Sequence, residues 1–234
     1  MEKRAIILAG GKGTRLKPYT ISLPKPLVPI DDLPILEIII LQLKRHGFGH
    51  ITITVNHMAE ILKAYFGDGS KWNIKIDYTI ENKALSTMGP LTLVKDLPEH
   101  FIVMNGDVLT DLNFGQFYEY HVSNGSPFTI ASHRREEKID YGVLVRDENF
   151  QLTGFEEKPT YKFLVSMGVY MVSRKIAQTI PSDTFYGFDD LMKAMINEEN
   201  YPKIYEYDGY WLDIGRPSDY QRAIEEFDRD KFIG

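Results

Sequence analysis

The chain has 234 residues, of which 43% are hydrophobic and 26% charged, and a net charge of −6 at neutral pH. This composition is typical of a soluble globular protein, and the length favours one domain with a large core over residues 1–234. The acidic balance argues against a nucleic-acid-binding surface, and the absence of cysteine excludes disulfides and thiolate metal sites.

No segment has the pattern of a membrane span or a secretory leader. The longest apolar stretch, residues 35–43, is interrupted by Glu37 and Gln42 and is too short to cross a bilayer. The apolar run after Lys3 and Arg4 is only about five residues, shorter than the ~7–15 of a signal peptide. These features predict a cytoplasmic protein without a membrane partner.

Strands and helices alternate in the first half of the chain. Short apolar or β-branched runs predict strands, and apolar segments preceded by Pro34, Asn56 or Asn113 predict helices. The strands are expected at residues 5–8, 50–55, 73–80 and 101–104, and the helices at 34–43, 59–66, 87–94 and 113–121. Such alternation predicts an α/β fold with a Rossmann-like, mostly parallel central sheet flanked by helices.

The second half has a different pattern. Residues 141–146 and 151–156 flank a polar turn and predict a hairpin. A strand, a helix, a strand and a last helix follow at residues 163–172, 188–197, 203–207 and 217–227. We expect this half, from about residue 126 to 234, to add mixed strands beside the sheet and to bind a second substrate. The first half, to about residue 125, would then bind the first substrate.

A glycine-rich basic turn follows the first strand, in the sequence AIILAGGKGTRL at residues 5–16. Three glycines allow a sharp turn whose N–H groups can approach a ligand closely, and Lys12, Arg15 and Lys25 surround it with positive charge. The pattern fits neither the Walker A motif nor G-x-G-x-x-G. The turn therefore predicts a polyphosphate site of another kind, and the alternative is a tight turn with solvated cations.

Two aspartates are candidate ligands for a hard cation. Asp107 follows an apolar strand, where ligands bind in parallel sheets, and Asp213 lies in the apolar stretch Trp-Leu-Asp-Ile-Gly, where an unpaired carboxylate would be unfavourable. Mg²⁺ typically takes one or two carboxylates plus substrate phosphate oxygens, so these aspartates predict a Mg²⁺ site, with Mn²⁺ as the alternative. Asp107 could instead be a turn residue, as we expect of Asp111.

The turn and the following LPKPLVPI, residues 23–30, together resemble the signature of sugar-1-phosphate nucleotidyltransferases, also called nucleotide-sugar pyrophosphorylases. The resemblance extends over nearly the whole chain, from Ala5 to about Glu226. Later segments also match the family: Gly-Asp at 106–107, Tyr-Gly-Val at 141–143, Glu-Lys-Pro at 157–159, Ser-Met-Gly-Val-Tyr at 166–170 and Trp-Leu-Asp-x-Gly at 211–215. The resemblance implies a GT-A-like nucleotidyltransferase fold.

The resemblance also implies a role for each matching residue. The catalytic residues would be Arg15, Lys25, Asp107 and Asp213, with the two aspartates holding the metal. The nucleotide would be bound by Leu8, Ala9, Gly10, Gly11, Gly13, Thr14, Arg15, Lys25, Glu81, Thr87 and Gly89. The sugar phosphate would be bound by Asn105, Gly142, Glu157, Lys158, Ser166 and Gly168.

One segment departs from the family pattern. Where the family usually shows L-G-T-A-G, this chain keeps Thr87 and Gly89 but has Ser86 and Met88 at the first glycine and the alanine. The departure leaves the identity of the base open. Glu81 could accept hydrogen bonds from a guanine edge, and the resemblance to guanylyltransferase-like members also favours GTP, with UTP, CTP and dTTP as alternatives.

The expected reaction is nucleotidyl transfer from a nucleoside triphosphate to a sugar 1-phosphate, giving a nucleotide sugar for glycan synthesis and pyrophosphate. A phosphate dianion is already a competent nucleophile, so charge neutralisation and positioning are enough. One alternative is a regulatory subunit that binds nucleotide sugars without catalysis. Another is a glycosyltransferase, which usually carries a D-x-D motif, whereas Asp107 and Asp111 are spaced more widely. A homo-oligomer is compatible with the sequence.

Overall fold

The computed structural model describes residues 2–56 and 58–233. The strands of its main sheet are β1 (Lys3–Leu8), β4 (Phe48–Val55), β5 (Lys75–Ile80), β6 (His100–Asn105), β8 (Phe128–Lys138), β11 (Thr160–Ser173) and β12 (Lys203–Glu206). The short strand pairs are β2 (Pro29–Ile30) with β3 (Leu33–Pro34), β7 (Val108–Thr110) with β13 (Trp211–Asp213), and β9 (Val143–Arg146) with β10 (Leu152–Glu156). The helices are α1 (Ile35–Arg45), α2 (Ala59–Phe66), α3 (Phe114–Ser123), α4 (Arg174–Ala177), α5 (Phe188–Asn197), α6 (Pro217–Glu226) and α7 (Arg229–Phe232).

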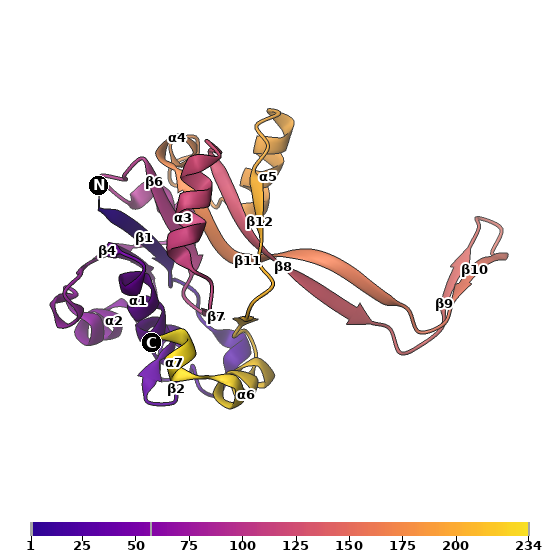
Figure 1. The fold of residues 1–234 in the computed structure, drawn as a ribbon, viewed down its shortest axis with the longest axis horizontal. Coiled ribbons are helices and arrows are strands. Elements are labelled where there is room, and N and C mark those ends of the chain that lie inside the picture. The colour runs from indigo at the N-terminus through magenta and orange to yellow at the C-terminus, as the bar shows by residue number, and fades with distance from the viewer. Residues whose placement is uncertain (1, 57, 234) are drawn as a thin grey trace.

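The seven-stranded sheet has the order β12-β8-β11-β6-β1-β4-β5. β11 is antiparallel to both of its neighbours, and the other neighbouring strands are parallel. The predicted α/β fold with a mostly parallel sheet is therefore confirmed (Figure 1). Since the carboxyl ends of β1 and β6 meet at one edge, the glycine-rich turn and Asp107 lie on the same side of the molecule.

Alternate residues of the central strands enter two separate cores. Ala5 and Ile7 of β1 lie in a core that contains residues of α1, α2 and α3, whereas Ile6 lies in a second core with residues of α4 and α5. All three side chains are fully buried. The period of two along a strand thus places helices against both faces of the sheet, as predicted.

Local signals predicted several boundaries well. The side chain of Asn113 accepts the N–H of Gln116 at 3.0 Å and caps α3, and α5 has the predicted bounds. Asn56 does not cap α2, because the helix begins after Met58, whose left-handed backbone directs the chain into it. The helix predicted at residues 87–94 is a 3₁₀ helix over Gly89–Leu93.

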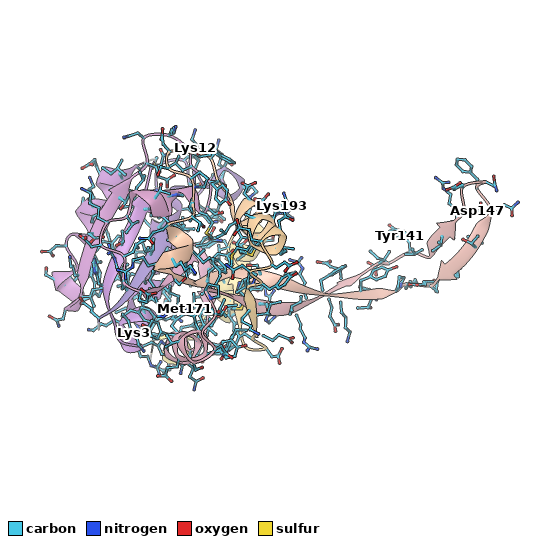
Figure 2. All side chains as sticks on the ribbon, turned by 90° about the horizontal axis from the view of Figure 1, so that it is seen from above. Lys3, Lys12, Tyr141, Asp147, Met171 and Lys193 are labelled. Carbon is cyan, nitrogen blue, oxygen red and sulfur yellow. The ribbon has the colours of Figure 1, made fainter. Side chains whose placement is uncertain are left out.

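The largest departure concerns the predicted hairpin. β9 and β10 do form a hairpin around the predicted turn, but they make a separate two-stranded sheet rather than strands beside the main one. The outer parts of β8 and β11 carry this hairpin away from the body as a long arm (Figures 1 and 2). We define the arm as residues 134–165. The strand β8, which leads into it, was not predicted.

Candidate active site

The glycine-rich turn is tied to the strands on either side of it. Ala9 donates its N–H to the carbonyl of Thr54 at 2.9 Å, and Gly106 donates to the carbonyl of Leu8 at 2.9 Å. These bonds hold the ends of β1, β4 and β6 together. The turn and the segment that carries Asp107 are therefore neighbours.

Gly13 determines how the turn packs against Lys25. Its φ is +61°, a left-handed conformation that favours glycine, and Thr20 fixes its carbonyl with a 2.7 Å hydrogen bond. A Cβ added to Gly13 would lie 3.0 Å from the Thr20 Cγ2 and 3.2 Å from the Lys25 Cβ. The structure thus brings the turn and Lys25 together, as the two motifs predicted.

Lys25 and the two predicted metal ligands form one charged cluster. The Lys25 ammonium donates to one carboxylate oxygen of Asp107. β7 pairs with β13 so that Val108 lies opposite Asp213, and Ile214 donates its N–H to the Asp107 carbonyl at 3.1 Å. Burial and the neighbouring charge of Asp107 raise the pKa of Asp213, while Lys25 and Arg15 act in the opposite direction. The two carboxylates therefore lie close enough to repel each other.

This pair fits a hard divalent cation that also binds a substrate. The second carboxylate oxygen of Asp107 is buried and has no hydrogen-bond partner among the described residues, which is unfavourable unless a ligand supplies one. In the described part of the chain, no cluster of three or more His, Cys, Asp or Glu side chains could hold a metal. Two carboxylates with the remaining positions left to water and phosphate are typical of a Mg²⁺ site.

A cavity of about 350 Å³ lies on one side of this cluster. The predicted nucleotide-binding residues that line it are Leu8, Gly10, Gly11, Glu81 and Thr87, and Asn105 and Asp107 also line it. Lys25, Thr14 and Arg15 lie outside this lining, and Gly89 is buried, with its N–H bonded to the carbonyl of Tyr186. Thr54, Asn56 and Phe185 also line the cavity and carry no local signal that predicted them.

Glu81 is the one acidic side chain at the inner wall of this cavity besides Asp107. It is only 7% exposed, and it accepts the N–H of Leu85 at 3.4 Å. A Cβ on Gly10 would lie 2.6 Å from its second carboxylate oxygen, so a larger residue at this position would displace the Glu81 carboxylate. Burial raises the pKa of Glu81, and the Leu85 N–H partly offsets that effect. Next to it, the buried hydroxyl of Thr54 has no hydrogen-bond partner among the described residues.

A second cavity, of about 580 Å³, lies on the Asp213 side of the cluster. Five arginines line it: Arg15, Arg134, Arg135, Arg216 and Arg222. Three of them pair with Glu206, Glu137 and Glu226, whereas Arg15 and Arg216 form no ion pair within residues 2–56 and 58–233. Only Arg15 was predicted, because the other four, although Arg216 directly follows the Trp-Leu-Asp-x-Gly motif, are not themselves residues of the recognised motifs.

The predicted sugar-phosphate residues fall into two groups. Asn105, Ser166 and Gly168 lie together, since a Cβ on Gly168 would be 2.6 Å from the Asn105 amide nitrogen and the Gly168 N–H points to the Ser166 hydroxyl at 3.3 Å. Gly142, Glu157 and Lys158 lie on the arm, with Gly142 packed against Glu157 and the ring of Phe155. Figure 2 shows Tyr141, next to Gly142, far out from the body. In one chain, the arm therefore separates the second group from the first.

Asp111 has the structural role expected of it. Its carboxylate accepts hydrogen bonds from the Tyr207 hydroxyl and from the Tyr210 N–H, the latter at 2.7 Å, and pairs with Lys231 at 2.9 Å. These contacts attach α7 and the segment before β13 to the end of β7. Asp111 therefore supports the position of Asp213 rather than the site itself.

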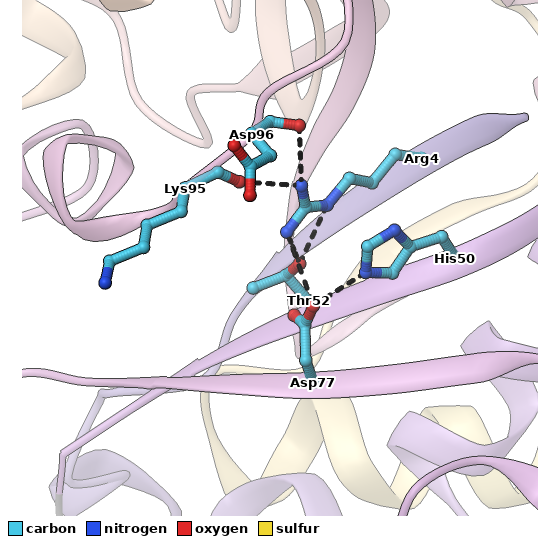
Figure 3. Close-up of polar contacts among 6 residues, drawn as sticks. All are labelled: Arg4, His50, Thr52, Asp77, Lys95 and Asp96. Carbon is cyan, nitrogen blue, oxygen red and sulfur yellow. Dashed lines mark hydrogen bonds and ion pairs between the residues drawn. The ribbon is translucent and has the colours of Figure 1, made fainter. Parts of the chain in front are cut away.

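A larger cavity, of about 790 Å³, lies along the Arg4 face of β1, β4 and β5, away from the glycine-rich turn. Arg4 donates to the Thr52 hydroxyl and to the carbonyls of Lys95 and Asp96, and Asp77 accepts from both Arg4 and His50 (Figure 3). Although burial raises the pKa of Asp77, its hydrogen bonds to Thr52 and His50 and the charge of Arg4 lower it below the usual value. This network joins strands to a loop and leaves no polar group of Arg4 or Asp77 without a partner.

Known proteins with this sequence pattern and fold are nucleotidyltransferases. The profile of the family described as "Nucleotidyl transferase" matches residues 4–230. A UTP–glucose-1-phosphate uridylyltransferase of Synechocystis is 32% identical over 94% of this chain, and a mannose-1-phosphate guanyltransferase of Schizosaccharomyces pombe is 33% identical over 93%. The chain spans 62% of the length of each of these relatives.

Two solved structures share the fold. HddC from Yersinia pseudotuberculosis, complexed with GMP-PN, is 28% identical, with a TM-score of 0.72 over 97% of this chain and 100% of its own. A putative glucose-1-phosphate thymidylyltransferase from Bacillus anthracis is 22% identical, with a TM-score of 0.77 over 97% of this chain and 96% of its own, and shows the fold alone. Because the family profile covers residues 4–230, which include both cavities and the cluster between them, the protein belongs to the nucleotidyl transferase family.

Proposed function

We propose that this protein transfers a nucleotidyl group from a nucleoside triphosphate to a sugar 1-phosphate, releasing pyrophosphate and a nucleotide sugar. The observation that carries this proposal is the arrangement of two cavities on either side of the Lys25, Asp107 and Asp213 cluster. In such a reaction, the nucleoside triphosphate would lie across the cluster, with its base in the smaller cavity and its pyrophosphate in the arginine-lined one. The names of the relatives support the same reaction class.

In this proposal, an oxygen of the sugar phosphate attacks the α-phosphorus of the nucleoside triphosphate. The bond between that phosphorus and the oxygen that bridges the α- and β-phosphates breaks at the same time. Pyrophosphate leaves with the bonding electrons, so no proton transfer to the protein is needed. Lys25 neutralises charge at the α-phosphate, and Arg15, in the arginine-lined cavity, neutralises charge on the leaving pyrophosphate. Lys158 binds the attacking phosphate, and Glu157 accepts hydrogen bonds from the sugar hydroxyls.

Asp107 and Asp213 hold the divalent cation, Mg²⁺ in this proposal or Mn²⁺ in its place. Such a cation, when bound, offsets negative charge on the substrate phosphates. Lys25 has a second role here, because its ammonium already orients one carboxylate oxygen of Asp107 and leaves the other oxygen free.

GTP is the proposed nucleotide. Glu81 supplies an acceptor at the wall of the 350 Å³ cavity, and guanine presents two neighbouring donors, its N1–H and its amino group. The S. pombe relative is named a guanyltransferase and HddC was solved with GMP-PN, whereas the Synechocystis relative is named for UTP. The proposed setting is the cytoplasm, without a nucleic acid or membrane partner. In the described residues, no helix is long and apolar enough to span a membrane.

The test is pyrophosphate release from each of four nucleoside triphosphates with several sugar 1-phosphates, in Mg²⁺, in Mn²⁺ and in EDTA. We expect the highest kcat/KM with GTP and no turnover in EDTA. Arg15→Ala is expected to lower turnover about 10²–10³-fold with an unchanged melting temperature, since it removes a charge needed mainly in the transition state. Arg45→Ala is the matched control, because α1 ends at the opposite edge of the sheet. Nucleotide-sugar binding without pyrophosphate release from any pair would instead identify a regulatory subunit.

A further inference from the structure

The arm exposes a set of large apolar side chains that the described residues of its own chain leave more than half open. They are Tyr141, Leu144, Val145, Phe150, Leu152, Phe155 and Phe163, with exposed fractions from 51% to 79%. A two-stranded ribbon is marginally stable in water without further packing, and its edges are open to other strands. The arm therefore needs a partner surface.

The area of these side chains corresponds to that of a stable protein interface. An aromatic side chain can bury ~150–250 Å² and an aliphatic one somewhat less, so covering seven of them at these exposures removes on the order of 800 Å² from water. A standard interface buries about the same area on each partner. One arm on each of two chains would be enough for a dimer.

The body offers an apolar groove at the base of the arm. A cavity of about 360 Å³ is lined by residues of α5, β8, β11 and β12, including Met192 and Ile204. At its rim, Ile196 and Tyr201 are more than half exposed. Each chain thus carries both an apolar hairpin and an apolar groove, the complementary pair that a two-fold dimer requires.

The base of the arm keeps the hairpin away from the groove of its own chain. β8 and β11 pair without a break from Ser132 and Ser166 to Lys138 and Thr160. Seven pairs at ~3.4 Å per residue make a stem of about 20 Å. Because this twisted, curved stem carries the hairpin well away from the body (Figure 1), the groove within reach of the hairpin is that of another chain.

The groove adjoins the first group of predicted sugar-phosphate residues, the group that lies on the body. Ser166 lines the groove and also contacts Gly168, which packs against Asn105. On the arm, Lys158 is three residues from Phe155 of the hairpin, so at most about 10 Å of chain separates the two. A hairpin seated in the groove would therefore carry Glu157 and Lys158 to the Asn105 side of the same body.

We propose that two copies of this chain exchange arms, so that the hairpin of each fills the apolar groove of the other and its Glu157 and Lys158 complete the other copy's active site. The positions of the catalytic residues in this inference rest on the proposed function. The exchange itself rests on the arm, the stem and the groove.

The test of the shared site is complementation between two inactive variants. Copies carrying Asp107→Asn or Lys158→Ala are co-expressed with different tags and purified on both tags. In a mixed dimer, one body has an intact Asp107 and receives an intact arm, so we expect about half the activity of the wild-type dimer. Each variant alone is expected to stay below one hundredth of wild type. A mixed dimer no more active than its parents would overturn the proposal, because the arm would then serve its own chain.

The test of the exchange itself does not need activity. The chain has no cysteine, so a disulfide between one copy with Leu152→Cys and another with Met192→Cys can arise only between copies. We expect a covalent dimer from this pair and none from Glu119→Cys with Met192→Cys, because Glu119 lies on α3. A monomeric mass at 10 µM and no cross-link would overturn the exchange. If the wild type is inactive but the cross-link forms, the proposed function fails and the exchange stands.

Discussion

The structure predicts that Glu81 selects the base, and Glu81→Gln tests this directly. The substitution keeps the size of the side chain but replaces one carboxylate oxygen by an amide that donates. Because the Leu85 N–H occupies only one oxygen of the wild-type carboxylate, the other remains available to the cavity. A guanine edge that met a donor in place of an acceptor would lose about 1–3 kcal/mol of recognition, as at other bidentate base contacts.

This free energy corresponds to a loss of about 5- to 150-fold in kcat/KM for GTP. We would measure kcat/KM by pyrophosphate release for all four nucleoside triphosphates at fixed sugar 1-phosphate. Glu119→Gln, an exposed site on α3, controls for the loss of one negative charge. We expect the GTP value alone to fall strongly, and Thr54→Val to have a smaller effect with an unchanged melting temperature. An equal loss for all four nucleotides would refute the argument, because Glu81 would then support the turn through Gly10 instead of reading the base.

Three further predictions concern the metal ligands and two buried groups. Asp107→Asn should lower metal-dependent turnover at least 10²-fold with an unchanged circular dichroism spectrum, whereas a turn residue would affect folding and leave activity per folded molecule intact. Glu37 accepts hydrogen bonds from Tyr65, Lys71 and the buried Trp72, so Glu37→Ala should lower the unfolding free energy by about 3–5 kcal/mol and Lys71→Ala by less than about 1 kcal/mol in urea titrations. Burial and the charge of His100 lower the pKa of His121 to about 4. The unfolded chain binds that proton near pH 6.5, so stability should fall between pH 6.5 and 4 by up to about 3 kcal/mol, and His121→Gln should flatten this dependence.

The parts of the fold that follow local rules could be predicted. The apolar run of β1, the side-chain cap at Asn113 and the amphipathic α5 each depend on residues within a few positions of one another. The sites at the ends of β1 and β6 followed from the rule that ligands bind beyond the carboxyl ends of parallel strands. The local sequence was therefore enough to predict the part of the candidate site that contains Asp107.

The hairpin of the arm was predicted, but its stem strand β8 could not be, because the physical signal of that strand is absent. The outer part of β8 is the polar run Arg134 to Lys138, with both faces open to solvent, so it shows no alternation of apolar and polar residues. The arginine-lined cavity was missed for a related reason. Its residues come from β8, β13, α6 and the glycine-rich turn, and only the tertiary fold brings them together.

In the proposed function, the arginine-lined cavity would also explain how an acidic protein binds a polyphosphate. Net charge acts over long distances only weakly, since salt screens it within about 8 Å, so the charges that face the ligand decide its sign. Here Glu137, Glu206 and Glu226 each pair with an arginine of the wall and orient it, and Asp219 accepts the N–H groups of Gly215 and Arg216, while Glu136 and Asp213 also line the cavity. Arg15 and Arg216 have no such partner among the described residues and so retain their charge for the ligand. Three of the acidic side chains of this protein therefore serve to order arginines of the cavity wall.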